Sequence, residues 1–378
     1  MSLMLPALVR DRLNLADVLP SCLAALSGAE NLLGLPAAPR ILVIVIDGLG
    51  ALQLHAHAGH ARFLAPLART SIDSVFPTTT ASALTSLATG TRPGSHGLVG
   101  YTVLDADRDR VVNQLTGWDE GMRPELWQRE RTVWELAAKT GVEVSAVGPA
   151  QYAGSGFSRA ILRGARYHSA TTVAQRLDTA VRLLGASPRA LVYVYVPELD
   201  AIGHARGPES ALWREALEDL DRDMRGALSQ LPAASGVLLT ADHGQVTVAE
   251  HQHILFDRSP ELVRGVRHVG GEPRALHLYV DPDATPEERA LLKQAWTAAE
   301  SSRAWVVDRG ELIDSGWLGE VAPEVESRIG DLVIAARKRV AYYDSRADPR
   351  ARGMIGQHGS FTPEELQVPL VRLGEFAA

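Results

Sequence analysis

Three short apolar runs of the sequence, 41–46, 191–196 and 237–240, lead directly into acidic and imidazole side chains. In chain order these side chains are Asp47, Asp200, His204, Asp242 and His243. Carboxylate oxygens and imidazole nitrogens without thiolates suit a divalent cation such as zinc or manganese. We therefore predict a metal site, provided that the fold brings the ends of the three runs together.

Each fragment taken alone has an ordinary structural explanation. An Asp-Gly pair such as Asp47-Gly48 after a strand is commonly a turn. Asp200 and His204 are four residues apart, so they would share a face only if this segment forms a helical turn. The same kind of side chain after three separate runs is much harder to obtain by accident, and this repetition favours a site.

A possible nucleophile lies in the segment Pro77-Thr78-Thr79-Thr80, which precedes a stretch of helical composition, 81–88, that ends at Gly90. Thr80 would lie at the helix N-terminus, where free backbone N–H groups and the helix dipole favour an anion such as a phosphoryl group. A hydroxyl is a poor nucleophile at neutral pH unless a metal or a base lowers its pKa. The alternative is that the threonines only cap the helix.

The elements that must position these residues alternate between short β-branched runs and longer amphipathic segments. This alternation predicts an α/β fold, with a mostly parallel central sheet covered by helices on both faces. The expected strands are Ile41–Ile46, Ser71–Phe76, Val142–Val147, Leu191–Val196, Val237–Thr240, Leu276–Val280 and Asp331–Ala335. The expected helices are Thr132–Thr140, Thr172–Leu184, Pro208–Leu231 and Pro286–Ala298. Because sites in open α/β sheets form outside the carboxyl ends of strands, the aspartates and histidines should meet at one sheet edge.

Composition excludes several classes of protein. The chain has 378 residues, 46% of them hydrophobic, so it can bury a large core. Its net charge of −7 shows no basic excess, so we expect neither a nucleic-acid partner nor an acidic membrane surface. The single cysteine, Cys22, excludes a disulfide framework and a cysteine-based zinc cluster. No secretory signal and no apolar stretch of membrane-spanning length are evident, so we expect a cytoplasmic protein.

We expect one catalytic domain over residues 1–378. Residues 1–36 would form an N-terminal extension outside the chemistry-bearing motifs. Two weakly patterned stretches, about 100–130 and 245–270, are expected to be long loops or a small lid, because long loops in compact domains are often functional. The oligomeric state has no readable signal in the sequence.

Six motifs occur in one order along the chain and together resemble a known family. They are Val43-Ile44-Val45-Ile46-Asp47-Gly48, Phe76-Pro77-Thr78-Thr79-Thr80, Thr89-Gly90-Thr91-Arg92-Pro93-Gly94-Ser95-His96-Gly97, Asp200-Ala201-Ile202-Gly203-His204, Ala241-Asp242-His243-Gly244 and Gly356-Gln357-His358-Gly359. This set resembles the alkaline phosphatase superfamily, specifically its nucleotide pyrophosphatase/phosphodiesterase branch. The motifs span nearly the whole chain, from Asp47 to His358.

The resemblance implies a phosphoryl-transfer site with two divalent metal ions, preferably zinc, with manganese as the alternative. By the family pattern one metal would be held by Asp200, His204 and His358. The other would be held by Asp47, Asp242, His243 and the oxygen of Thr80. Thr80 would attack phosphorus and form a phosphothreonine, and the substrate would be a small phosphate ester or a nucleotide.

The sequence departs from the family at Tyr101, where the phosphodiesterases carry an asparagine that donates to a phosphoryl oxygen. The Tyr101 hydroxyl could replace that donor, or the side chain could line the leaving-group pocket. This departure leaves the substrate class open. A phosphomonoesterase or phosphonate hydrolase on the same two-metal site is the near alternative. A non-catalytic module that binds metal or a phospho-ligand is the remaining one.

Overall fold

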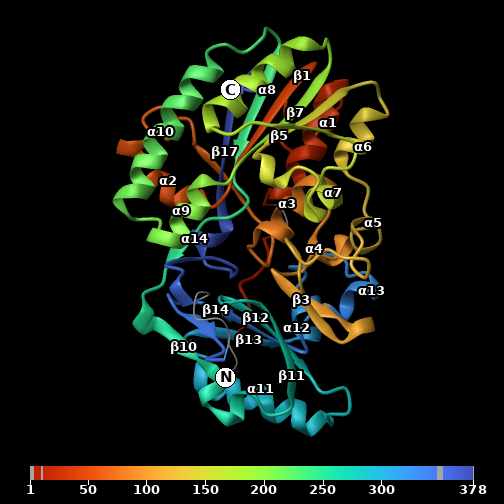
Figure 1. Cartoon of the computed structure of the whole chain (residues 1–378), viewed down its shortest axis with the longest axis vertical. Coiled ribbons are helices and arrows are strands. Elements are labelled where there is room, and N and C mark those ends of the chain that lie inside the picture. Colours follow the sequence, from red (N-terminus) through yellow and green to blue (C-terminus); the bar gives the residue numbers. More distant parts are fainter. Residues whose placement is uncertain (1–3, 10–11, 347–351, 378) are drawn as a thin grey trace.

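The computed structural model describes residues 4–9, 12–346 and 352–377, and it contains two large sheets that lie one beyond the other along the long axis (Figure 1). The central sheet has seven strands in the order β2-β17-β8-β1-β7-β5-β6. Their bounds are β1 (Arg40–Ile46), β2 (Thr70–Asp73), β5 (Glu143–Gly148), β6 (Arg166–Ser169), β7 (Ala190–Val196), β8 (Ser235–Thr240) and β17 (Gln367–Gly374).

The strand pairs confirm the predicted mostly parallel sheet. The run β8-β1-β7-β5-β6 is parallel throughout, and only β17 is antiparallel to its neighbours β8 and β2. In β1 every residue after Arg40 is buried, which explains its continuous apolar run. The strand expected over Ser71–Phe76 ends at Asp73, so that prediction is wrong for its last three residues.

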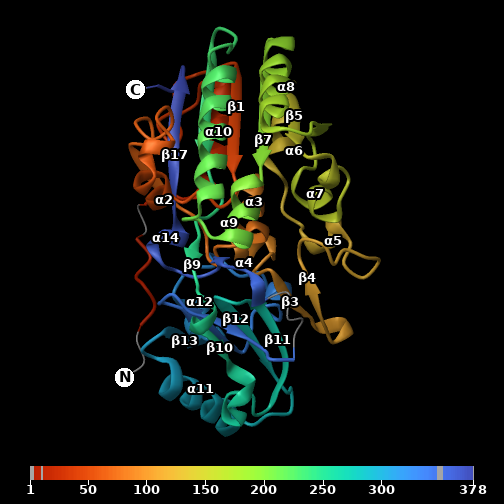
Figure 2. The same cartoon turned by 60° about the vertical axis from the view of Figure 1, so that its left-hand side comes forward.

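Helices cover both faces of the central sheet (Figures 1 and 2). One group packs around the long helices α8 and α10, and the other contains α1, α3 and α6. The bounds are α1 (Val18–Ser27), α2 (Ala51–Ala56), α3 (Thr80–Thr89), α4 (Pro93–His96), α5 (Pro124–Trp127), α6 (Val133–Ala138), α7 (Gly156–Ile161), α8 (Val173–Ala186), α9 (Glu198–Arg206), α10 (Ala211–Leu228) and α14 (Pro363–Leu366). The helices expected around 132–140, 172–184 and 208–231 are confirmed as α6, α8 and α10.

The second sheet is antiparallel and was not anticipated. Its six strands follow the order β13-β14-β12-β11-β3-β4. They are β3 (Thr102–Asp105), β4 (Arg110–Asn113), β11 (Val266–Glu272), β12 (Ala275–Val280), β13 (Ala304–Asp308) and β14 (Leu332–Ala336). The runs expected at 276–280 and 331–335 are strands, but they lie in this sheet. Because β12 and β14 are buried at every residue, their composition resembles that of a buried parallel strand.

The remaining strands and α-helices lie beside the second sheet or between the two sheets (Figure 2). They are β9 (Val246–Thr247), β10 (His253–Leu255), β15 (Ala341–Tyr343), β16 (Gly356–Gln357), α11 (Pro286–Glu300), α12 (Arg309–Asp314) and α13 (Pro323–Glu326). The expected start of α11 is confirmed, because Thr285 and Glu288 form a reciprocal capping box with Pro286 in the first turn. Within the described ranges, no helix combines the length and apolar character that a membrane crossing requires.

The segments singled out by their weak pattern contain regular structure. The stretch 100–130 holds β3, β4 and α5, while 245–270 holds β9, β10 and the start of β11. In the described part of the N-terminal extension, α1 packs into the main core through Val18, Leu19 and Cys22. The function of the two stretches as a lid stays a prediction.

Candidate active site

The ends of three neighbouring strands bring the predicted residues together. In the sheet β1 lies between β7 and β8, and Ile46 pairs with Val196 while Val45 pairs with Thr240. The strands therefore end at the same edge, where β1 leads to Asp47 and β8 to the Asp242-His243 pair. Helix α9 begins just after β7 and carries the remaining predicted pair. The predicted convergence of these side chains is confirmed.

The side chains form two clusters, each with ligand atoms within 4.8 Å of one another. One cluster contains Asp200, His204 and His358, and the other contains Asp47, Asp242 and His243. The clusters adjoin, because the rings of His243 and His358 stack with centroids 3.7 Å apart. This is the grouping that the family resemblance implies.

Every imidazole in the clusters presents the same nitrogen to the site. In each ring Nδ1 faces a backbone carbonyl oxygen, which can only accept a hydrogen bond, so Nδ1 carries the proton and Nε2 is left with a free lone pair. The Nε2 atoms of His204 and His358 lie 3.2 Å apart. The Nδ1-to-carbonyl pairs are His204 with Gly356 at 2.7 Å, His358 with Thr78 at 2.8 Å and His243 with Gly244 at 3.3 Å. Lone pairs that converge without a proton between them suit a cation.

In the buried cluster, the two oxygens of each carboxylate have different surroundings. Oδ1 of Asp242 accepts hydrogen bonds from the backbone N–H groups of Gly48 at 3.2 Å and His243 at 2.9 Å. Oδ2 of Asp47 accepts one from the Tyr195 hydroxyl. The other oxygens, Asp47 Oδ1 and Asp242 Oδ2, are buried and have no hydrogen-bond partner among the described residues. A buried carboxylate oxygen without a partner is costly, and a bound cation would remove that cost.

The shifted pKa values of the cluster residues also indicate that positive charge would be stabilised there. Burial, followed by repulsion from Asp242 and Asp200, raises the pKa of Asp47 well above its usual value. Burial, followed by the neighbouring His243 and His204, lowers the pKa of His358 well below its usual value. Positive charge would favour ionised carboxylates and neutral imidazoles, which are the forms that bind metals. The residues present therefore fit two divalent cations.

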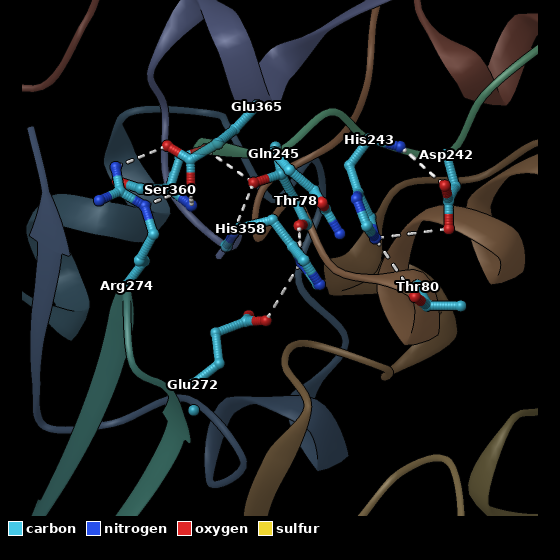
Figure 3. Close-up of polar contacts among 12 residues, drawn as sticks. Thr78, Thr80, Asp242, His243, Gln245, Glu272, Arg274, His358, Ser360 and Glu365 are labelled. Atoms are coloured by element: carbon cyan, nitrogen blue, oxygen red, sulfur yellow. Dashed lines mark hydrogen bonds and ion pairs between the residues drawn. The ribbon is translucent and has the colours of Figure 1, made fainter. Parts of the chain in front are cut away.

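Thr80 lies beside the buried cluster, at the first residue of α3. Its Oγ1 is 3.2 Å from Nε2 of His243 (Figure 3). The other two threonines are buried, and Oγ1 of Thr78 bonds to the 358–360 loop instead of capping the helix. Thr79 is the N-cap residue, but its side chain makes no capping hydrogen bond. Neither Thr79 nor Thr80 therefore serves mainly as a cap.

The loop that carries His358 is fixed to the second sheet by a buried ion pair. Arg274, in the turn between β11 and β12, donates to both carboxylate oxygens of Glu365 at 2.7 Å, and both side chains are fully buried. The same carboxylate accepts the N–H of Ser360 at 3.0 Å (Figure 3). Glu272, whose pKa burial raises to about 8, lies 3.8 Å from Nδ1 of His358. The second sheet thus positions one of the predicted ligands.

A cavity of about 650 Å³ opens beside Asp47, Thr80 and Asp200. Six of its lining residues are aromatic, and they come from β6, β7, α7 and the chain before α7. The aromatic lining residues are Trp118, Tyr152, Phe157, Tyr167, Tyr193 and Tyr195. The tyrosines were not among the predicted site residues. The two-residue spacing of Tyr193 and Tyr195 in an otherwise aliphatic strand is the available signal, because such residues share a face.

The remaining predicted site residue, Tyr101, lies apart from this lining. Its side chain is 39% exposed, and it is not among the described residues that line the cavity. Its role in phosphoryl binding stays a prediction. From the expected lid at 100–130, Leu115, Thr116 and Trp118 reach the cavity, whereas no lining residue comes from 245–270.

Comparison with curated proteins gives relatives of one kind. Rat ectonucleotide pyrophosphatase/phosphodiesterase family member 7 is 26% identical over 201 residues, which cover 50% of this chain and 43% of the relative. An uncharacterized pyrophosphatase/phosphodiesterase of Schizosaccharomyces pombe is 22% identical over 239 residues, covering 57% of this chain and 47% of the relative. The matches span less than half the length of these relatives.

Comparison with solved structures supports the fold. Murine ectonucleotide pyrophosphatase/phosphodiesterase 5 superimposes with a TM-score of 0.67 at 18% identity, covering 88% of this chain and 87% of that one. An inactive threonine-to-alanine variant of the same murine protein, in complex with AMP, gives a TM-score of 0.67 at 17% identity, covering 89% and 88%. At this identity the likeness shows that the chains share a fold.

The match that decides the family covers most of the chain. The family model described as type I phosphodiesterase / nucleotide pyrophosphatase matches residues 41–361, a range that contains both clusters and Thr80. The chain therefore belongs to the type I phosphodiesterase/nucleotide pyrophosphatase family, a branch of the alkaline phosphatase superfamily.

Proposed function

We propose that this protein is a metal-dependent phosphodiesterase or nucleotide pyrophosphatase that hydrolyses small phosphate esters through a phosphothreonine on Thr80. The observation that carries the proposal is the position of Thr80, which lies between a cluster suited to a cation and an aromatic cavity. Family membership supports the reaction class, and the AMP complex of the murine neighbour supports a nucleotide as substrate.

Two divalent cations, when bound, would stabilise the negative charge on the attacking and leaving oxygens of an in-line displacement. Asp200, His204 and His358 would hold one of them. Asp47, Asp242 and His243, with the Thr80 oxygen, would hold the other. The donor set of oxygen and nitrogen favours zinc, with manganese as the alternative.

The chain's own part in the reaction begins at Thr80. Its hydroxyl loses a proton to solvent water, and the oxygen attacks phosphorus while the bond to the leaving oxygen breaks. The leaving oxygen takes a proton from water and departs as an alcohol, or as a phosphate when a pyrophosphate is cleaved. Water then attacks the phosphothreonine, which releases phosphate or a phosphate monoester and restores the hydroxyl. The aromatic walls of the cavity offer flat faces on which a nucleobase or aryl group can stack, so they would orient the ester beside Thr80.

The charge of the site favours a diester over a monoester. Two divalent cations would bring four positive charges, which three carboxylates and a deprotonated Thr80 oxygen would offset. The substrate's own charge must then be offset by other groups, and a monoester carries about two negative charges where a diester carries one. Among the described lining residues the only cationic side chain is the exposed Arg159. This lining suits the smaller charge.

The proposal is tested by comparing kcat/KM for a bis-aryl phosphate diester with that for the matching aryl monoester, on zinc-loaded protein. We expect the diester to be preferred by about tenfold or more, the size of a 1.4 kcal/mol difference between transition states. A clear preference for the monoester would support the phosphomonoesterase alternative. Turnover of neither ester, by protein that holds two zinc ions, would support the non-catalytic binding module.

Removing the cations should lower stability, and more so at higher pH. In the metal-free protein burial raises the pKa values of Asp47, Asp200 and Asp242. At these carboxyl groups the folded state binds more protons than the unfolded chain, so their contribution to stability falls as pH rises. The lowered pKa values of His243 and His358 have the opposite effect, because these rings destabilise the folded state once pH falls below the pKa of a free imidazole. A cation at 100 times its Kd adds about 2.7 kcal/mol per site. Thermal unfolding at pH 5.5 and 8, with zinc or with a chelator, measures how much stability is lost with the cations at each pH. An equal Tm with and without zinc at pH 8 would contradict the two-metal site.

A further inference from the structure

We infer that Tyr195 and Gln245 are positioning residues, each of which orients the carboxylate of a different metal cluster. The two metal affinities would then depend on separate side chains. This inference rests on the proposed two-metal function, because it concerns how the chain prepares its ligands for the cations. It is carried by hydrogen bonds that hold one oxygen of a carboxylate and leave the other facing the imidazoles.

Tyr195 acts on the buried cluster. It lies on β7 directly opposite Val45 of β1, which is two residues before Asp47. Its hydroxyl donates to Oδ2 of Asp47. The other oxygen, Oδ1, has no hydrogen-bond partner among the described residues and lies 3.5 Å from Nε2 of His243. The tyrosine thus turns one carboxylate oxygen away from the cluster and leaves the second for a cation.

Gln245 acts on the other cluster in the same way. Its Nε2 donates to Oδ1 of Asp200 at 2.5 Å and approaches the Asp200 backbone oxygen at 3.2 Å. The remaining oxygen of Asp200, Oδ2, faces Nε2 of His204 at 3.4 Å. Gln245 is 1% exposed, so this amide does not exchange its partner for solvent.

The Gln245 amide packs closely against two glycines, Gly203 and Gly356. A Cβ atom on Gly203 would lie 1.8 Å from the Gln245 Oε1, and one on Gly356 would lie 2.8 Å from it. The Gln53 side chain fixes the backbone of Gln245 by donating a hydrogen bond to its carbonyl oxygen. Neither glycine has a positive φ angle, so close contacts account for the absence of a side chain at these positions. At Gly203 the closest contact is the amide, and at Gly356 it is the Gly203 carbonyl oxygen, 2.5 Å from an added Cβ.

The third carboxylate shows why two side chains are involved and not three. Asp242 receives its hydrogen bonds from backbone N–H groups, which no substitution removes directly. The donors that a substitution can remove are therefore the Tyr195 hydroxyl in one cluster and the Gln245 amide in the other. Loss of such a partner of a metal ligand typically costs about 10- to 100-fold in metal affinity.

The test is equilibrium competition for Zn²⁺ alone between the full chain and a chromogenic chelator. We expect Tyr195→Phe and Gln245→Met each to weaken one of two zinc sites by about 10- to 100-fold and to leave the other unchanged. Tyr193→Phe is the matched control, because Tyr193 lies on the same strand and lines the same cavity without a hydrogen bond to a carboxylate among the described residues. It should leave both affinities unchanged.

The sites are assigned in a His358→Ala background, in which only the cluster around Asp47 should still bind zinc. There Tyr195→Phe should weaken the remaining site, and Gln245→Met should not. If Gln245→Met does not fold, Gln245→Leu also removes the donor without adding a charge, and the same single loss is expected. Unchanged affinities in both variants, or equal loss at both sites, would overturn the inference. Fewer than two zinc ions on the unmodified chain would instead contradict the proposed function.

Discussion

Replacing Thr80 with alanine is expected to lower kcat/KM for a phosphate diester by about a thousandfold or more while two cations remain bound. The methyl group of alanine cannot attack phosphorus, so no phosphothreonine forms. The six other candidate ligands stay in place, because Thr80 contributes to the site only through Oγ1 near His243. Steady-state kinetics and elemental analysis of the same preparation measure the two effects separately.

Two further variants make this prediction specific to one hydroxyl. Thr80→Ser retains an oxygen at the start of α3 and should keep a large part of the activity. Thr79→Ala removes a buried side chain that makes no capping hydrogen bond, and it should keep the catalytic step. Acid-quenched protein should carry a phosphoryl group on Thr80 in the unmodified chain. Substantial turnover by Thr80→Ala would assign the nucleophile to Thr78 or Thr79.

The part of the site that could be predicted from sequence is the part that the sheet determines. Asp47 and Asp242 come directly after apolar runs, and parallel neighbours end at the same edge, so their convergence follows from the strand pattern. Asp200 and His204 follow the third run on α9, and their four-residue spacing places them on one face. The start of α11 after Thr285 was predictable for a similar reason, since its capping box is encoded within a few residues.

Other features depend on contacts between distant segments and have no local signal. His358 reaches its cluster from a loop held by the buried pair of Arg274 and Glu365, so only the family resemblance indicated it. The hydrogen bond from Tyr195 to Asp47 follows from the register of β7 against β1. The second sheet was missed because fully buried antiparallel strands have the continuous apolar composition of parallel ones.

Replacing His358 with alanine is expected to remove about one of the two cations per chain and to reduce diester turnover by about a hundredfold or more. The Nε2 lone pair of His358 converges with that of His204 at 3.2 Å, and among the described residues these two supply the imidazoles of this cluster. Elemental analysis after dialysis at a low, buffered zinc concentration measures the loss. His60→Ala is the control, because His60 is a half-buried residue that pairs with Glu218 outside both clusters.

The expected loss is one cation and not two, because the clusters share no residue. The cluster around Asp47 keeps all of its own candidate ligands in this variant, including Thr80 and its buried carboxylates. The variant also removes the His358 ring that stacks on His243, with centroids 3.7 Å apart. For the cluster around Asp47 this ring is a packing contact, because His358 is a candidate ligand of the other cluster. Unchanged metal content would exclude His358 as a ligand. Loss of both cations would show instead that the clusters bind metal as one cooperative unit, and the separate control of affinity inferred for Tyr195 and Gln245 would then fail with it.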